Sequence, residues 1–186
     1  MSEKYSQPIR ADKDGFYMGC PEEVGIRLAS QLKGHKRAVE LCCGIGALSI
    51  QLAKEIPYVV GIDMNKDRIK NARHNAKLYG VQKRTLFLFG DVLDRNLLKS
   101  LFADVAILDP DWSKNGEEKT TRVPTINDTQ PSLQLLYNLT KELVTPNIIA
   151  KVPLNFTEDT LKDIGVRRLE KAYWEGRERF QIAYFF

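Results

Sequence analysis

One stretch of sequence limits the fold of this chain more than any other. Residues 37–52 read RAVELCCGIGALSIQL, in which a short apolar run leads into Gly44-Ile45-Gly46 and a segment of helical composition follows. This order predicts a strand, a tight turn and a helix. Glycine is required in the turn because a Cβ would block the close approach of a ligand to the backbone. The first turn of the helix would then direct its free N–H groups toward that ligand.

Such a turn serves NAD enzymes, flavin enzymes and methyltransferases, and in some chains it is only a tight turn. Two details argue against a dinucleotide fingerprint. Ser49 stands where the third glycine of that fingerprint would be, and Glu40 lies inside the strand ahead of Gly44. The remaining sequence therefore has to decide which ligand the turn holds.

The rest of the chain alternates apolar runs with amphipathic segments. We expect strands at 38–42, 58–62, 85–89, 105–108 and 147–152, and helices after Pro21 and at 46–54, 66–79, 97–101, 132–143 and 158–164. Two further strands, 166–173 and 180–186, flank a turn at Gly176 and predict an antiparallel hairpin. Continuous apolar strands between helices are typical of an α/β fold with a mostly parallel sheet covered by helices on both faces. A chain of 186 residues suits one domain, 1–186.

Composition excludes several classes of protein. Hydrophobic residues make up 43% and charged residues 28%, as in ordinary globular proteins, and the polar start MSEKYSQPIRADKDG contains no signal peptide or anchor. We therefore expect a cytoplasmic protein that does not enter a membrane, with a nuclear location open for a eukaryotic source. Three cysteines and two histidines in unsuitable spacing predict neither a disulfide framework nor a metal site. The net charge of +4 permits nucleic acid as a partner without requiring it.

Acidic residues follow three of the predicted strands, at the edge of a parallel sheet where ligands bind. Asp63 lies nineteen residues after Gly44, a spacing that lets its carboxylate accept both hydroxyls of a ribose. Asp91 would face the exocyclic amine of an adenine. The alternatives are that Asp63 only caps the next helix, a role that Asn65 could equally fill, and that Asp91 belongs to a plain turn. Together with the glycine turn, these acids predict a nucleoside pocket.

The fourth strand ends in Asp109-Pro110-Asp111-Trp112. An amine conjugated to an aromatic ring is a poor nucleophile because its lone pair is spread into the ring. The Asp109 carboxylate and the Pro110 carbonyl could hold both amine protons and turn the lone pair toward an electrophile, so that positioning supplies most of the rate. Trp112 would stack on the base, a contact worth about 1–3 kcal/mol. The alternative is a turn with a packed tryptophan.

These residues and several longer segments resemble the class I S-adenosylmethionine methyltransferases, and within that class the trimethylguanosine synthase family, which methylates guanine N2 of capped RNAs. The similar segments are IRADKDGFYMGCPEEVGIRLA, VELCCGIGALSIQLA, GIDMNKDRIKNARHNAKLYGV and LEKAYWEGRERFQIAYFF. The resemblance implies a Rossmann-like, seven-stranded, mostly parallel sheet of strand order 3-2-1-4-5-7-6 with strand 7 antiparallel. It also implies S-adenosylmethionine as cofactor and RNA as partner.

The resemblance also carries residue roles. It implies cofactor contacts at Gly44, Gly46, Asp63 and Asp91, with Pro21 and Glu22 near the amino-acid end of the cofactor. We also expect Glu40, Met64 and Val92 to contact the cofactor, and residues 1–20 to pack near the cofactor site. The resemblance implies catalytic positions at Asp109, Pro110 and Trp112. It implies substrate contacts at Asn75 and Trp112, and we expect Asp111 and Lys114, which lie beside Trp112 in the sequence, to contact the substrate as well.

The chain also departs from the family pattern. Asp111 replaces a second proline, Ser113-Lys114 replaces two glycines, and Cys20 replaces a threonine. The extra carboxylate of Asp111 could attract a cationic base such as 7-methylguanine, or mark a different amine or a weakened catalyst. Three functions stay open: methylation of an RNA amine, methylation of a protein or small molecule, and a silent module that binds RNA or activates a partner. An RNA surface should carry Lys114, Lys119, Arg122 and Arg167-Arg168.

Overall fold

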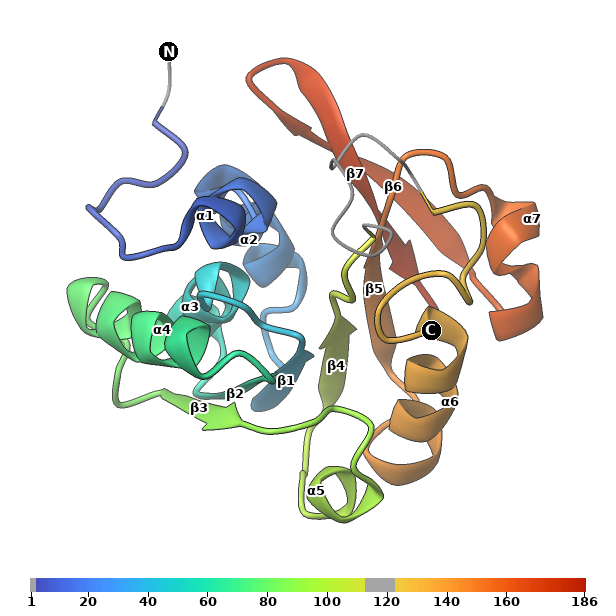
Figure 1. Ribbon diagram of the computed structural model, residues 1–186, viewed down its shortest axis with the longest axis horizontal. Helices are drawn as coiled ribbons and strands as arrows, with labels where there is room; N and C mark the ends of the chain where they lie inside the picture. Colours follow the sequence, from blue (N-terminus) through green and yellow to red (C-terminus); the bar gives the residue numbers. More distant parts are fainter. Residues whose placement is uncertain (1–2, 113–122) are drawn as a thin grey trace. The chain divides into compact units, whose positions relative to one another are not determined.

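The computed structural model describes residues 3–112 and 123–186, and the chain divides into two compact units, residues 1–92 and 93–186 (Figure 1). The first unit contains α1 (Lys13–Met18), α2 (Glu22–Gln31), β1 (Arg37–Leu41), α3 (Ala47–Glu55), β2 (Tyr58–Asp63), α4 (Lys66–Leu78) and β3 (Thr85–Phe89). The second contains α5 (Arg95–Lys99), β4 (Val105–Leu108), α6 (Leu133–Leu143), β5 (Ile148–Val152), α7 (Glu158–Leu161), η1 (Lys162–Ile164), β6 (Arg168–Trp174) and β7 (Arg177–Tyr184). The single-domain organisation expected from the sequence stays a prediction.

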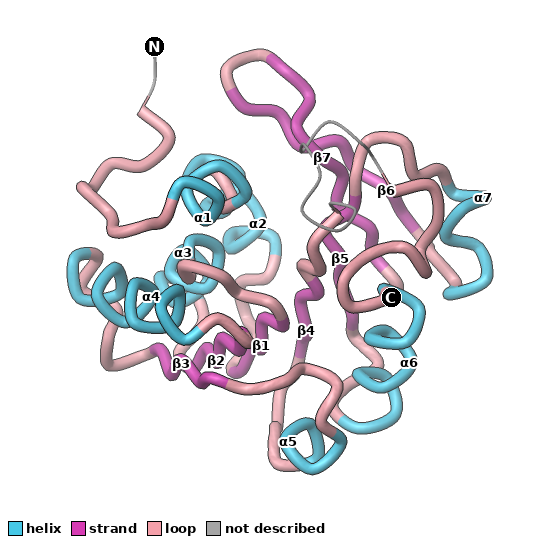
Figure 2. Tube along the Cα trace, in the orientation of Figure 1, coloured by secondary structure: helices cyan, strands magenta, loops and turns pink. Residues whose placement is uncertain are grey.

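The strands follow the order β3-β2-β1-β4-β5-β7-β6. β1, β2 and β3 pair in parallel, β4 pairs in parallel with β5, and β7 is antiparallel to both β5 and β6. The fold class and strand order predicted from the sequence are therefore confirmed, with helices packed around the strands (Figure 2).

Burial explains why the central strands read as continuous apolar runs. All four residues of β4 and all five of β5 are buried, as are residues 38–41 of β1. A strand that is covered on both faces has no solvent side for polar residues, so alternation is lost. Polar residues in these strands therefore need partners inside the protein.

Local signals place most helix ends where the sequence predicts them. Asn65 caps α4 by accepting hydrogen bonds from the N–H groups of Asp67 and Arg68, at 3.0 and 3.1 Å. Thr157 caps α7 as expected, and its hydroxyl and that of Thr160 form a reciprocal capping box. The predicted helix 158–164 ends in a 3-10 turn, η1, after Leu161.

Two elements differ from the expectation. α1 was not predicted because a six-residue helix has too few turns for a periodic apolar face, and the Asp12 side chain caps it by accepting from the Gly15 N–H. β7 begins at Arg177, three residues before the expected strand, because backbone pairing with β6 continues through the exposed residues 177–179. Within the part of the chain that the structure describes, every helix is too short or too polar to cross a lipid bilayer.

The turn at Gly46 gives the first testable prediction. Gly46 has φ +75°, and a Cβ there would lie 2.9 Å from the Phe87 ring and from the Ala72 Cβ. Gly46→Ala should therefore lower the free energy of unfolding by about 2–4 kcal/mol, measured by chemical denaturation, because it adds a clash to left-handed strain. Gly80→Ala is the matched control: φ is +71° there and a Cβ meets nothing within 4 Å, so only the strain of about 1 kcal/mol remains. Equal losses at both positions would contradict this packing role.

Candidate functional site

The glycine loop between β1 and α3 combines an open position with a packed one. Gly44 has φ +53°, and a Cβ built on it meets nothing within 4 Å, so its Cα faces open space. Gly46, in contrast, is backed by the Phe87 ring. Cys42 also has a positive φ, +69°, which is rare for a residue with a side chain and typical of functional turns. The loop thus offers bare backbone to a ligand at Gly44 while its other side is fixed against β3.

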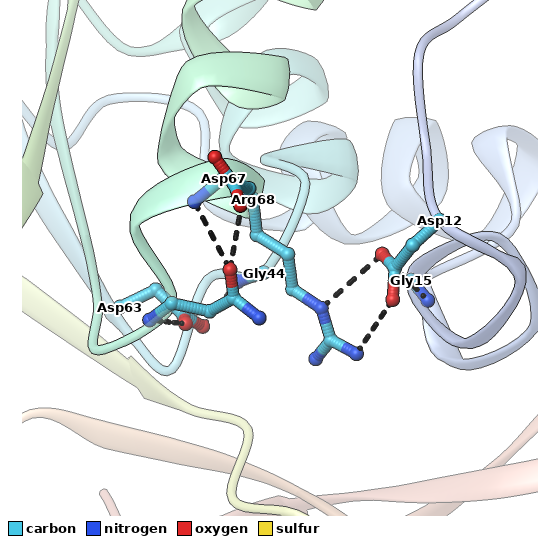
Figure 3. Close-up of polar contacts among 7 residues, drawn as sticks. Asp12, Gly15, Gly44, Asp63, Asp67 and Arg68 are labelled. Carbon is cyan, nitrogen blue, oxygen red and sulfur yellow. Dashed lines mark hydrogen bonds and ion pairs between the residues drawn. The ribbon is translucent and has the colours of Figure 1, made fainter.

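Asp63 lies at the carboxyl end of β2 and contacts this loop directly (Figure 3). Its carboxylate is 8% exposed; Oδ2 accepts from the Gly44 N–H at 2.7 Å and Oδ1 from the Asn65 N–H at 2.8 Å. Because Asn65 caps α4, the alternative in which Asp63 is only a helix cap is wrong. Each carboxylate oxygen has more than one lone pair, so both can accept a further hydrogen bond from a ligand hydroxyl.

The ends of β2 and β3 lie side by side. The Gly90 N–H donates to the Asp63 carbonyl at 3.1 Å, which brings the turn carrying Asp91 next to the end of β2. Asp91 is exposed and Val92 is buried. Met64, which follows Asp63, is 74% exposed and presents an apolar side chain at the same end of the sheet. The glycine loop, Asp63 and the turn that carries Asp91 therefore lie side by side in the first unit, while their contact with a cofactor stays a prediction.

Glu40 has a local role that the sequence did not reveal. It is buried in β1, and its Oε2 accepts from both the backbone N–H of Ser49, at 2.8 Å, and the Ser49 hydroxyl. This pair ties the first turns of α3 to β1 and explains why the fingerprint glycine is replaced by serine. Contact between Glu40 and the cofactor stays a prediction.

Asn75 joins the N-terminal segment to the glycine loop. It is 1% exposed; its Oδ1 accepts from the Arg10 N–H at 2.8 Å, and its Nδ2 donates to the carbonyls of Arg10 and Ile45 at 3.0 and 3.1 Å. Tyr5 packs with Ile45 in a small apolar cluster. The segment thus packs beside the loop, whereas the contact of Asn75 with a guanine stays a prediction.

A second group of polar contacts holds the same segment. Glu22, which follows the buried Pro21 at the start of α2, accepts from the Ser6 N–H at 2.7 Å and from the Tyr79 hydroxyl at 2.6 Å. Burial alone would raise the pKa of Glu22, but these donors outweigh it and lower the pKa below its usual value. Burial and the nearby Glu22 raise the pKa of Tyr79 to about 12, so its hydroxyl stays a donor.

Asp12 completes the attachment of the segment to α4. Its carboxylate pairs with the Arg68 guanidinium at 3.1 Å (Figure 3). Although partial burial opposes ionisation, the hydrogen bond and charge of Arg68 lower the pKa of Asp12.

The predicted acceptor motif lies in the second unit, at the end of β4. Pro110 is buried, and Asp111 exchanges two backbone hydrogen bonds with Gln130, both at 2.8 Å. Trp112 is partly buried, with its ring centroid 6.3 Å from that of Phe180. The motif therefore has a fixed backbone. Lys114, Lys119 and Arg122 lie outside the described residues.

The structure adds one residue that sequence reasoning missed. Lys151 of β5 places its Nζ 2.7 Å from Asp109 Oδ2, with side chains 5% and 16% exposed. The same Nζ lies 5.2 Å from the Trp112 ring centroid and 4.9 Å from that of Phe180. A signal for this contact was present, because Lys151 is the one charged residue of β5, whose other residues are apolar and which is buried throughout.

No group of three or more His, Cys, Asp or Glu residues within 3–112 and 123–186 is arranged to hold a metal ion.

The Glu22 contacts give the second prediction. Because its pKa is lower in the folded protein than in the unfolded chain, ionised Glu22 stabilises the fold above about pH 4.3, and this contribution is lost as the pH falls through the folded pKa. Glu22→Gln should lower the free energy of unfolding at pH 7 by about 1–2 kcal/mol. The difference in unfolding free energy between wild type and this variant should become smaller as the pH falls. The matched control Glu23→Gln, on an exposed neighbour, should stay within about 0.5 kcal/mol. A gap independent of pH would contradict the role of the Glu22 charge.

Two known proteins resemble the chain, one of them over most of its length. The chain is 27% identical to trimethylguanosine synthase of Schizosaccharomyces pombe over 162 residues, 82% of this chain and 66% of that protein. It is 39% identical to an uncharacterized RNA methyltransferase of Parasynechococcus marenigrum over 90 residues, 48% of this chain and 19% of that protein. The chain thus spans less than two thirds of either relative.

The fold has solved counterparts as well. A Porphyromonas gingivalis protein assigned as a methyltransferase superposes with a TM-score of 0.76 at 19% sequence identity, covering 94% of this chain and 42% of that one. The model of the RNA cap guanine-N2 methyltransferase family matches residues 35–181. The chain therefore belongs to the RNA cap guanine-N2 methyltransferase family, and it is a class I methyltransferase with S-adenosylmethionine as cofactor.

Proposed function

We propose that this chain transfers the methyl group of S-adenosylmethionine to the exocyclic N2 amine of a guanine in RNA. Family membership supports RNA methylation, and the guanine-N2 activity named in the description of the family supports the choice of atom. The name of the Schizosaccharomyces pombe relative, trimethylguanosine synthase, agrees with guanosine as the acceptor. The observation that carries the proposal is the acceptor motif of the second unit, where Asp109 and Trp112 are held at the end of β4 by contacts with β5 and β7.

In the first unit, the described geometry fits a nucleoside-bearing cofactor. Gly44 leaves open space for a ligand, Asp63 has acceptor capacity for ribose hydroxyls, and Asp91 follows on the adjoining strand end. We assign the cofactor to these residues, with Gly46, Met64 and Val92 beside them. Pro21 and Glu40 support the cofactor site indirectly, because they fix the segments that border the glycine loop. Asn75 supports it by joining that loop to the N-terminal segment.

The acceptor residues have to overcome the weak nucleophilicity of an aromatic amine. When bound, S-adenosylmethionine supplies an electrophilic methyl group on a positively charged sulfur. Asp109 and the Pro110 carbonyl accept the two amine N–H groups, which turns the nitrogen lone pair out of the ring system. Trp112 restrains the base by stacking, and Asp111 lies beside it. No strong base is needed, since the nitrogen becomes acidic once it carries the methyl group and then releases its proton to solvent.

Nucleoside mass spectrometry tests this function. After incubation with RNA and cofactor, wild type should produce N2-methylguanosine, and Trp112→Ala should lower the yield at least 100-fold while its affinity for S-adenosylhomocysteine stays the same. Trp174→Ala is the matched control because Trp174 lies on the β6–β7 hairpin, where it packs with Arg179, and it should leave the product unchanged.

Three results would contradict the proposal. Methylation of a protein or small-molecule pool without RNA product favours the second class of acceptor. Cofactor binding without any methyl transfer favours a silent module. An unchanged yield from Trp112→Ala removes the stacking role.

A further inference from the structure

The first unit concentrates positive charge in the segment between Asp63 and Asp91, the two acids assigned to the cofactor. Residues 64–90 hold seven lysine and arginine residues and one acid, Asp67. Taking this segment out of the chain's 28 basic and 24 acidic residues leaves 21 against 23. The positive charge of the chain is therefore gathered in one segment, and such a segment favours an anionic partner.

Four of these cations form a basic stripe along α4: Lys66, Lys70, Arg73 and Lys77. They follow one another at intervals of four, three and four residues, which places them on one face of the helix. All four are exposed, and the buried residues of α4 lie on another face. At the helical rise per residue the basic stripe is about 16 Å long, so it can reach more than one phosphate of a nucleic acid strand.

Neighbouring acids offset only part of this charge. Asp67 pairs with Lys70 at 2.8 Å, and counting it against the four cations leaves the basic stripe with a net charge of +3. The two side chains of that pair are 84% and 65% exposed, so water screens their attraction and a phosphate can take the place of the carboxylate. Asp12 pairs with Arg68 at 3.1 Å, and Arg68 lies outside the basic stripe (Figure 3).

An exposed aromatic ring lies beside the basic stripe, on the edge strand β3. Arg73 joins the two elements: its Nε and Nη2 donate to the Phe87 carbonyl at 3.2 and 2.7 Å, which leaves three of its five N–H donors for an anion. Phe89 points to the same face of the sheet as Phe87, because side chains alternate along a strand, yet it is 59% exposed. Its register partner is Asp63, three residues before Lys66, so the ring lies near the start of the basic stripe.

We propose that the basic stripe and Phe89 form a docking surface for the single-stranded RNA that carries the acceptor base. The proposal rests on the proposed function, which makes RNA the substrate, and adds a second place where that RNA is held. Phosphates contact the cations and one base stacks on Phe89, a combination that binds single strands of any sequence. An acidic protein matches the charge as well, but the exposed ring beside the cations favours RNA, whose bases stack on it.

RNA without guanine measures docking apart from the acceptor site. The full chain is titrated against a fluorescein-labelled oligouridine by fluorescence polarisation. With four phosphate contacts, the affinity of wild type should fall about 50-fold between salt concentrations of about 50 and 200 mM. The triple variant Lys66→Gln/Lys70→Gln/Lys77→Gln should bind at least tenfold more weakly at the lower concentration, and its fall over the same range should shrink to about threefold. Its affinity for S-adenosylhomocysteine should equal that of wild type, which shows that it is folded.

The matched control is the triple variant Lys99→Gln/Lys141→Gln/Lys162→Gln. It removes three exposed lysines of the second unit and lowers the net charge by the same amount. Its affinity for oligouridine should stay within threefold of wild type.

The stacking contact is tested by Phe89→Leu, which keeps an apolar side chain but removes the ring. We expect at least fivefold weaker binding of oligouridine with the salt dependence unchanged, because no phosphate contact is lost. Leu86→Ala is the matched control: Leu86 is 54% exposed on the same strand but points to the other face of the sheet, so its change should leave the affinity as in wild type. Unchanged affinity in Phe89→Leu would remove the ring from the proposed surface.

Three further outcomes separate the possibilities. Equal losses in the two lysine triples would show that overall charge attracts the RNA, and would overturn the proposal. Displacement of the labelled RNA by polyglutamate as readily as by unlabelled oligouridine would assign the surface to an acidic protein instead. Wild-type affinity in the triple variant of the basic stripe, while wild type forms N2-methylguanosine, refutes the inference alone, whereas RNA binding that depends on the basic stripe without methyl transfer to any RNA refutes the proposed function alone.

Discussion

The hydrogen bond from the Gly44 N–H to the Asp63 carboxylate is the interaction on which the first unit depends. It joins two segments nineteen residues apart, and it depends on the left-handed backbone at Gly44, with φ +53°, and on an acid at the last position of β2. Because the other Asp63 oxygen accepts from Asn65, the carboxylate has a fixed orientation before any ligand arrives. Such preorganisation reduces the ordering that binding would otherwise require.

The contacts around the glycine loop also fix its position. Three side-chain contacts hold the N-terminal segment in place: Asn75 with Arg10, Glu22 with Ser6, and Arg68 with Asp12. On the other side of the glycine loop, the hydrogen bond between Glu40 and Ser49 ties β1 to α3. The second unit uses a comparable arrangement, in which Lys151 fixes Asp109. In both units a charged side chain among the predicted site residues is positioned by a partner distant in sequence.

That distance explains what the sequence could and could not predict. The strands, the strand order and the acid at the end of β2 follow from local apolar runs and from the resemblance to a family with a known sheet. The cap at Thr157 follows from a local motif. The ion pair of Lys151 with Asp109 joins residues 42 positions apart, and α1 depends on its contacts with the rest of the unit, so neither leaves a periodic signal. Lys151 was still detectable as an isolated charge in an apolar strand.

Isothermal titration with S-adenosylhomocysteine tests the central claim most directly, using Asp63→Asn beside the matched variant Asp67→Asn. Asp67 is an exposed acid in the first turn of α4. The account predicts micromolar or tighter binding to wild type and to Asp67→Asn, and at least tenfold weaker binding to Asp63→Asn, equal to about 1.4 kcal/mol. Equal affinity of wild type and Asp63→Asn, or no binding to wild type, would contradict it.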